Sequence, residues 1–195
     1  LGGGPFSRDP LHLNEIQPVF EDGPFWKKGD VFLNMRHISM IMLYRPETDE
    51  IVWWKIGPWS AQHDVDVINE TTIGVYDNSV YNYGKGEFVD GHSRILYYDF
   101  ATDRVWSPFD DQLVSVELGT ETAGLFTLLP DDYLYVDESE SGRSLFFAPD
   151  GSLVAEYINR AENGLIFHQS WSRYMDRESG DRFREQIAAA GCVEG

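Results

Sequence analysis

The chain has 195 residues, of which 42% are hydrophobic and 14% aromatic, so it can bury a sizeable core. Its 15 Lys and Arg residues are outnumbered by 33 Asp and Glu, giving a net charge of −18. A surface of this sign repels phosphate backbones and anionic lipid headgroups, which argues against nucleic-acid and membrane-surface binding. No apolar run approaches the ~18 residues of a membrane span, and these residues contain no secretory signal.

Short strands separated by tight turns are predicted along most of the chain. Runs of β-branched and aromatic residues flank turns such as Pro46-Glu47-Thr48-Asp49 and Pro149-Asp150-Gly151, a pattern typical of antiparallel hairpins. In chain order, strands are expected at residues 12–20, 30–35, 40–44, 51–54, 63–68, 72–76, 95–98, 105–106, 123–129, 133–136, 145–147 and 153–157.

These strands repeat in groups of four, with a period near fifty residues. Four-stranded units at this period are the signature of a β-propeller, in which each unit is one blade. The third strand of each group is an almost unbroken apolar run, as expected for sheets that are covered on both faces. The sequence therefore predicts an all-β propeller of antiparallel four-stranded blades. The blades are expected at about residues 12–58, 62–109 and 122–159, with boundaries near Trp59, Asp110 and Asn159.

The end of the chain continues this pattern and then changes character. Residues 163–174 begin like the first strand of a fourth blade, so residues 1–175 are predicted to be a partial propeller. Propellers close with about four or more blades, so the remaining blades are expected to come from a longer chain or from another subunit. The other subunit could be a second copy of this chain, as in a homo-oligomer. Residues 176–195 form a tail whose short helix is expected at 181–190, with Asp181 as its N-cap.

Two histidines introduce the first strands of successive units. The innermost strand of each propeller blade lines the central channel, so if the first strand is innermost, His12 and His63 point at one cavity. His168, on the expected fourth unit, would reach the same cavity. Arg94 and Arg143 open the third strands of their blades, and one of them is expected to supply a fixed positive charge.

These residue types suit the transfer of an anionic group. An imidazole acts as nucleophile or as general acid and base near neutral pH, and the arginine fork donates to an oxyanion. The small residues Thr122-Ala123-Gly124 in the third unit would leave room for a ligand. A lone histidine beside a strand is more often a satisfied structural group, and only the repetition favours a site at His12 and His63. The His and Asp residues lack the ligand count of a metal site, so no metal is predicted.

Several short motifs, taken in order, resemble the later part of a bacterial arylsulfotransferase, the group that uses aryl sulfate esters as donors. They are His12-Leu13-Asn14, Gly29-Asp30-Val31-Phe32-Leu33-Asn34-Met35-Arg36, Gln62-His63-Asp64, Asp77-Asn78, Ser93-Arg94 and Asp150-Gly151-Ser152-Leu153-Val154. The resemblance covers most of the chain. It implies a six-bladed propeller, of which this chain is about half, with the active site in the central channel.

The resemblance also implies an activity and a set of site residues. In the family a histidine is sulfated covalently, while other histidines and an arginine stabilise the group in transfer. His63 and Arg94 lie on matching motifs and His12 on a third, whereas the surroundings of His168 match no clear pattern. Substrate-binding residues are expected at Asn14, Arg36, Asn78 and Arg143. The implied reaction moves a sulfuryl group from an aryl sulfate to a phenol, without a cofactor, in the periplasm or outside the cell.

Two other functional classes remain open from the sequence. A non-catalytic propeller would bind a partner or ligand on its faces, as this fold commonly does. A quinone- or metal-dependent oxidoreductase is the other, although no cluster of ligands supports it.

Overall fold

The computed structural model describes residues 9–80 and 88–191. Twelve strands form three four-stranded sheets, here called the first, second and third blades, and consecutive strands pair antiparallel within each blade. The first contains β1 (Leu13–Pro18), β2 (Val31–Met35), β3 (Met40–Arg45) and β4 (Glu50–Ile56). The second contains β5 (His63–Val67), β6 (Thr72–Asp77), β7 (Arg94–Asp99) and β8 (Arg104–Trp106). The third contains β9 (Leu125–Leu128), β10 (Leu134–Glu138), β11 (Arg143–Phe147) and β12 (Leu153–Ile158). The predicted all-β, propeller-type fold is confirmed.

Turn chemistry explains why each third strand reverses into a fourth. Asp49, Asp103 and Gly151 occupy corresponding places in the three hairpins, and all three have positive φ values of 54°, 54° and 83°. Aspartate and glycine are among the residues that tolerate this left-handed conformation. Local side-chain bonds support the turns, since Asp150 Oδ1 accepts from the backbone N–H of Ser152 at 3.0 Å.

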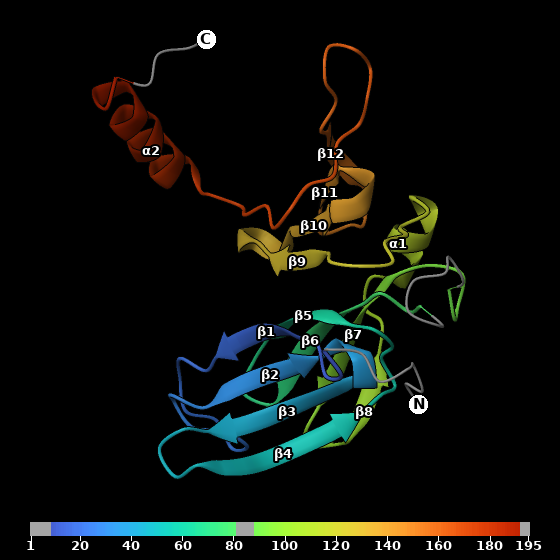
Figure 1. Cartoon of the computed structure of the whole chain (residues 1–195), viewed down its shortest axis with the longest axis vertical. Coiled ribbons are helices and arrows are strands. Elements are labelled where there is room, and N and C mark those ends of the chain that lie inside the picture. Colours follow the sequence, from blue (N-terminus) through green and yellow to red (C-terminus); the bar gives the residue numbers. More distant parts are fainter. Residues whose placement is uncertain (1–8, 81–87, 192–195) are drawn as a thin grey trace.

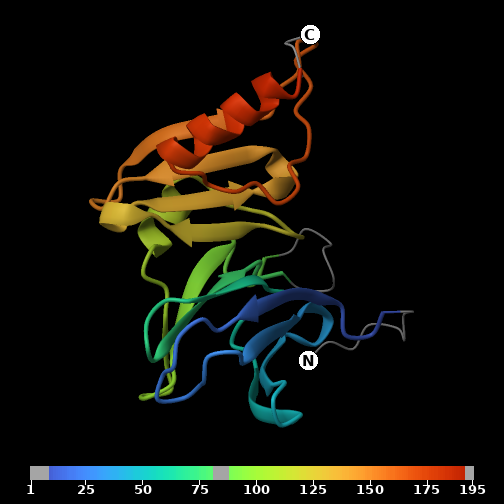
Figure 2. The ribbon, with the colours of Figure 1, turned by 90° about the vertical axis from the view of Figure 1, so that its left-hand side faces the viewer.

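The blades pack face to face, and the second blade is covered on both sides. Phe32 and Leu43 of the first blade pack with Val75 of the second in one core cluster. Tyr76 of the second blade packs with Phe126 of the third in another cluster. All six residues of β6 are consequently buried. Figure 2 shows the first blade at one end of the molecule and the third blade at the other.

The first strands of the blades meet along one inner edge. β5 contacts both β1 and β9, and it lies between them in Figure 1. Bulges show how the repeats align there, because Asn14 in β1 and Asp64 in β5 are the extra residues at the two register shifts. His12 therefore corresponds to Gln62, and not to His63. The two histidines are one residue apart in the repeat, which changes the direction in which a strand side chain points.

The segment after β12 differs from the expectation of a fourth blade. Residues 159–174 contain one isolated bridge, between Arg160 and Ile166, and no strand. The turn at Gly164, whose φ is 85°, folds this segment back on itself. The backbone N–H of Gln169 then donates to the carbonyl of Ser139 at 2.9 Å. This bond holds the segment against the third blade.

Two helices complete the described chain. α1 (Asp110–Ser115), which the sequence did not predict, packs Leu113 into the core beside the second blade. α2 (Arg177–Ala189) has no buried residue and stands away from the sheets in Figure 1. The expected start at Asp181 is wrong, because Asp176 caps the helix by accepting from the N–H of Ser179 at 2.7 Å. No helix in the described part of the chain is long and apolar enough to cross a membrane.

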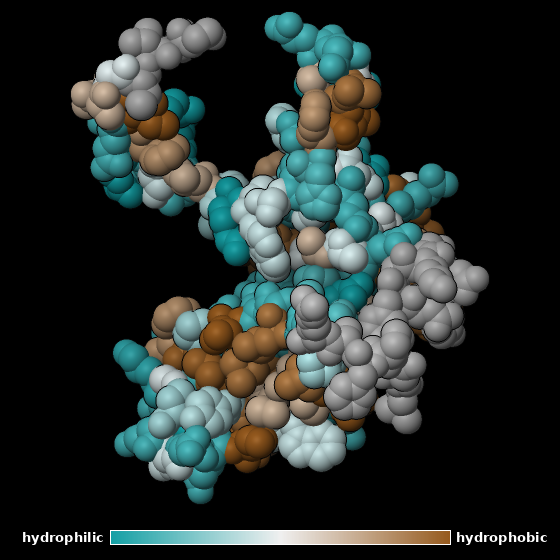
Figure 3. Space-filling view, viewed as in Figure 1, coloured by the Kyte–Doolittle hydropathy of each residue, from teal (hydrophilic) through white to brown (hydrophobic). Residues whose placement is uncertain are grey.

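The first blade leaves one apolar sheet face open. Ile16, Leu33, Met42 and Trp54 are register partners across its four strands, and Ile16 and Trp54 are 57% and 59% exposed. Figure 3 shows hydrophobic residues gathered over this blade. An apolar row of side chains therefore crosses all four strands of this face.

Adjacent tryptophans on β4 offer a test of which face is packed. Trp53 stacks on Tyr98 of the second blade with ring centroids 5.4 Å apart, whereas Trp54 points to the open face. We expect Trp53→Ala to lower the free energy of unfolding by about 2–4 kcal/mol, because it leaves a cavity between blades. Trp54→Ala, its matched control, should change it by less than about 1 kcal/mol. Urea unfolding measures both, and equal losses would contradict this packing.

Candidate functional site

His63 is the first residue of β5, at the inner edge, and it is 4% exposed. Its Nδ1 lies 2.6 Å from Oδ1 of Asn78, and its Nε2 accepts from the backbone N–H of Ala123 at 3.1 Å. An amide oxygen only accepts and a backbone N–H only donates, so the proton is on Nδ1 and the ring is neutral. Burial, together with the smaller effects of the charges of Arg36 and His12, lowers the pKa of His63 to about 4.

Asn78 extends this network into the third unit. Its Nδ2 donates to the carbonyls of Thr120 and Ala123, at 2.9 and 2.8 Å. Gly124, whose φ is 98°, packs so closely that a Cβ there would lie 2.5 Å from the Tyr76 ring. The small residues at 122–124 therefore do not leave room beside His63, as the sequence suggested, but close over it. Asn78, expected to bind substrate, holds the imidazole in one tautomer.

His12 lies in a more open environment. Its Nδ1 is 2.7 Å from Oδ2 of Asp9, its ring stacks on His37 with centroids 4.5 Å apart, and its side chain is 42% exposed. Nε2 makes no hydrogen bond to residues 9–80 or 88–191. A carboxylate on Nδ1 orients an imidazole and leaves Nε2 as the reactive nitrogen. His12 therefore has a nitrogen that is available for chemistry.

Arg36 is the arginine whose charge acts on His63. It is 5% exposed, its backbone N–H donates to the carbonyl of His12 at 3.1 Å, and its Nη2 donates to the carbonyl of Glu121 at 3.0 Å. It thus links the end of β2 with the start of β1 and with the segment before β9. Its positive charge lowers the pKa of His63.

Arg94 and Arg143 are held by carboxylates at equivalent places in their blades. Arg94 Nε bonds Oδ2 of Asp77 at 3.0 Å, and its guanidinium also pairs with Asp90. Arg143 Nε bonds Glu138 in the same cross-strand relation. Both arginines do open a third strand, where each neutralises an acidic partner at the end of the second strand.

His168 and Asn14 are placed differently from each other. His168 is exposed on the segment after β12, where its carbonyl accepts from Asn159 Nδ2 at 3.4 Å. Asn14 lies at the inner edge and donates from Nδ2 to the carbonyl of Gln62 at 3.0 Å, which ties the first blade to the second. The structure therefore brings His12, His63, Asn14 and Arg36 together and leaves His168 outside this group.

Three carboxyl groups, unpredicted from the sequence, lie at the same edge. Glu15 Oε2 accepts from the backbone N–H of Val65, and Asp64 Oδ2 accepts from that of Phe126 at 2.7 Å, so each joins neighbouring blades. Burial raises the pKa of Glu15 to about 7, and burial also raises the pKa of Asp64. The same cause raises the pKa of Asp66 to about 6.

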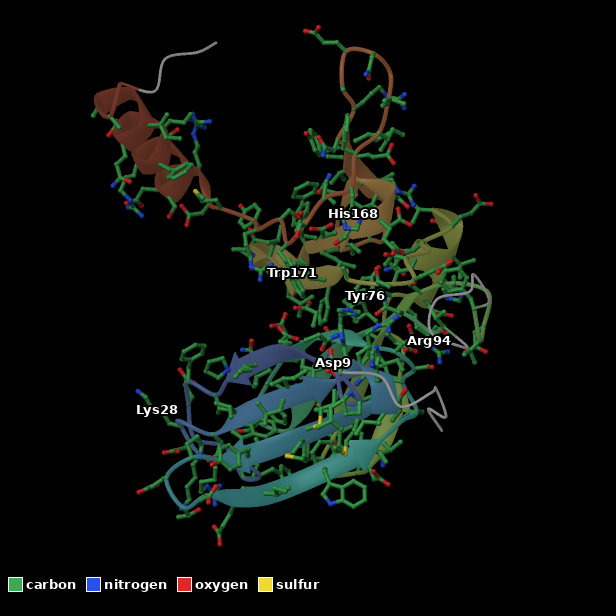
Figure 4. All side chains as sticks on the ribbon, viewed as in Figure 1. Asp9, Lys28, Tyr76, Arg94, His168 and Trp171 are labelled. Carbon is green, nitrogen blue, oxygen red and sulfur yellow. The ribbon has the colours of Figure 1, made fainter. Side chains whose placement is uncertain are left out.

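Trp171 is a further residue that the sequence patterns missed. Its ring lies beside that of His63, with centroids 6.4 Å apart. In Figure 4 it lies between the third blade and the first two. Only the folding of the segment after β12 brings it there, so no repeat or motif could have indicated it.

Other parts of the surface offer less chemistry. A cavity of about 340 Å³ is lined by residues including Arg143, Glu138 and Glu156, and none of the candidate histidines lines it. Within the described ranges, no group of three or more His, Cys, Asp or Glu side chains is arranged to hold a metal ion. The inner edge is therefore the stronger candidate site.

No curated protein matches the chain. Among solved structures, a functionally unknown protein from Desulfotomaculum acetoxidans is 11% identical, with a TM-score of 0.44, over 83% of this chain and 41% of that one. Hsv2 from Kluyvelomyces marxianus is 12% identical, with a TM-score of 0.32, over 74% of this chain and 52% of that one. The chain thus spans about half or less of these structures.

The sequence family provides the stronger result. A model described as arylsulfotransferase (ASST) matches residues 4–160, which include all three blades and the whole inner edge. This match covers well over half of the 195 residues. The chain belongs to the arylsulfotransferase (ASST) family.

Proposed function

We propose that this chain is part of an arylsulfotransferase that moves a sulfuryl group from an aryl sulfate ester to a phenol through a histidine intermediate. The observation that supports it most directly is that Arg36 and His12, which are joined by a backbone hydrogen bond, lie near enough to His63 for their charges to act on it, in a chain of this family. The family typically acts in the periplasm, and we propose the same compartment here.

His12 is the nucleophile in this proposal. Its Nε2 attacks sulfur, forming an N–S bond while the S–O bond to the aryl group breaks, and the aryloxide leaves and takes up a proton from water. In the second step the phenol oxygen attacks sulfur, the N–S bond breaks to return the free imidazole, and the phenol proton passes to water. Asp9 on Nδ1 holds the imidazole with Nε2 free to react.

The remaining residues stabilise the sulfuryl group in transfer or hold parts of the site in position. Arg36 supplies the fixed positive charge that an anionic sulfuryl group requires. His63 donates from Nδ1 to Asn78, and this pair holds the 120–124 segment beside the site. Arg94 fixes Asp77, the residue before Asn78. Asn14 joins the blades. His168 and Arg143 join the site only if further blades bring them nearer.

Other blades complete the channel in this proposal. The open face of the first blade, with Ile16, Leu33, Met42 and Trp54, is apolar and suits another sheet. We propose that further blades, from a longer chain or another subunit, cover this face and close a six-bladed ring. A monodisperse, cooperatively folded monomer of these 195 residues would contradict that arrangement.

His12→Gln tests the chemical assignment. With 4-nitrophenyl sulfate as donor and phenol as acceptor, we expect the variant of the full protein to release nitrophenol at least 10²–10⁴-fold more slowly, because that range is typical for losing a positioned acid–base imidazole. His92→Gln, which removes a partly exposed imidazole paired with Asp110, is the matched control and should keep full activity. Retention of full activity by His12→Gln would exclude His12 as nucleophile.

A non-catalytic binding propeller is the second candidate, and one observation favours it. Both ring nitrogens of His63 are satisfied inside the protein, which is the usual state of a structural histidine. If the full protein releases no nitrophenol from 4-nitrophenyl sulfate in the presence of phenol, the binding role is preferred.

A further inference from the structure

We infer that Trp171 is a specificity-determining residue that provides the aromatic surface on which the aryl ring of the substrate packs. This inference rests on the proposed sulfuryl transfer and deepens it. It concerns the aryl part of the substrates, which donor and acceptor share, and it assigns Trp171 no part in bond making. Planar aromatic ligands pack on tryptophan in offset or edge-to-face geometry, with an attraction beyond that of buried area.

Position is the first argument. The Trp171 and His63 rings lie 6.4 Å apart with an interplanar angle of 53°, so the indole stands beside the histidine at the inner edge. Trp171 remains 38% exposed, and part of its surface is therefore open to a ligand. Figure 4 shows it in the space that faces the first and second blades.

Backbone anchoring is the second argument. On one side of Trp171, Gln169 donates from its backbone N–H to the carbonyl of Ser139 and from Nε2 to that of Gly142, each at 2.9 Å. On the other side, the N–H of Ser172 donates to Asp137 Oδ2 at 2.9 Å. Trp171 itself has a φ of 56°, which is uncommon for a bulky residue. Its neighbours therefore hold the Trp171 backbone in a conformation that a bulky residue rarely adopts, as is seen at ligand sites.

Charge is the third argument. The Arg173 guanidinium lies 5.7 Å from the Trp171 ring centroid, so it is attracted to the electron-rich ring. Its charge also acts on Glu15, Asp64 and Asp66 and lowers the pKa of each against the effect of burial. Arg173 therefore links the indole with these buried carboxyl groups, because its charge acts on them while its guanidinium lies over the ring.

The experiment compares three replacements of Trp171 in the full protein. Binding of 4-nitrophenol, without donor, is measured by isothermal titration calorimetry, and KM and kcat are measured for transfer to phenol. We expect Trp171→Ala to weaken binding and raise KM at least tenfold while kcat changes less than threefold. Trp171→Phe should stay within about threefold of the wild type in both, because it keeps an aromatic face. Phe20→Ala, which removes an exposed aromatic ring between β1 and β2, is the control and should change neither.

Trp171→Leu keeps the experiment decisive if the alanine variant does not fold, because leucine fills space without an aromatic face. Wild-type affinity in a folded Trp171→Ala or Trp171→Leu variant would overturn the inference. A loss of binding equal for Phe and Leu would also overturn it, because shape alone would then explain the effect. If wild-type protein binds 4-nitrophenol through Trp171 but transfers no sulfuryl group, the aryl site stands and the proposed function fails.

Discussion

His63→Ala is expected to lower the free energy of unfolding by about 2–4 kcal/mol, besides any effect on sulfuryl transfer. The change removes two buried hydrogen bonds and leaves Oδ1 of Asn78 and the N–H of Ala123 without partners. A buried polar group left unsatisfied costs about 1–3 kcal/mol. Urea unfolding of the variant and the wild type at pH 7.5 measures this difference.

Two further measurements distinguish the effect of breaking the His63–Asn78 network from the effect of removing any histidine side chain. His168→Ala removes an exposed histidine and should change the free energy of unfolding by less than about 0.5 kcal/mol. His63 and Asn78 should show non-additive effects in a double-mutant cycle, because the second replacement removes a group that the first has already left unpaired. Additive losses, or a stable His63→Ala variant, would show that the pair contributes nothing to holding the blades together.

Glu15→Gln is expected to make the protein more stable than the wild type at pH 8, by about 1–3 kcal/mol, and equally stable near pH 4.5. Burial raises the pKa of Glu15 from 4.5 to about 7, so the folded state binds this proton more tightly than the unfolded state does. Its contribution to stability is therefore complete below pH 4.5 and is lost as the pH rises to about 7. Glutamine imitates the protonated form at every pH, since its oxygen can still accept from Val65.

The pH profile of the variant against that of the wild type isolates this effect. The pKa of His63 shifts the other way, from 6.5 to about 4, so its contribution is present above pH 6.5 and is lost as the pH falls towards 4. That contribution is common to both proteins and cancels in their difference. Glu21→Gln, at an exposed position, is the control and should show no such dependence. A difference between wild type and Glu15→Gln that does not change with pH would contradict the buried carboxyl.

Local chemistry determined the strands and the turns. Runs such as Met40–Arg45 and Arg94–Asp99 fold as predicted because their apolar and aromatic side chains fit a pleated sheet. Asp49 and Gly151 reverse the chain because they tolerate positive φ. The repeat of these signals indicated four-stranded blades, and the motifs on them indicated the family.

Tertiary contacts decided the site. Sequence spacing could not show that the bulges at Asn14 and Asp64 set His12 and His63 one residue apart, because a bulge is defined only by the pairing of two strands. The expected fourth strand failed for a related reason. Residues after Asn159 have strand-like composition, but bonds to Ser139 and Asp137 on the third blade hold them there.

The sequence by itself therefore determined the kind of blade, whereas the fold decided which groups can react. Burial and partners, which depend on residues far apart in the chain, keep His63 neutral, raise the pKa of Glu15, and leave Nε2 of His12 unbonded within the described chain. The placement of Trp171 beside His63 has the same origin, because 108 positions separate the two residues and only the packing of the blades joins them.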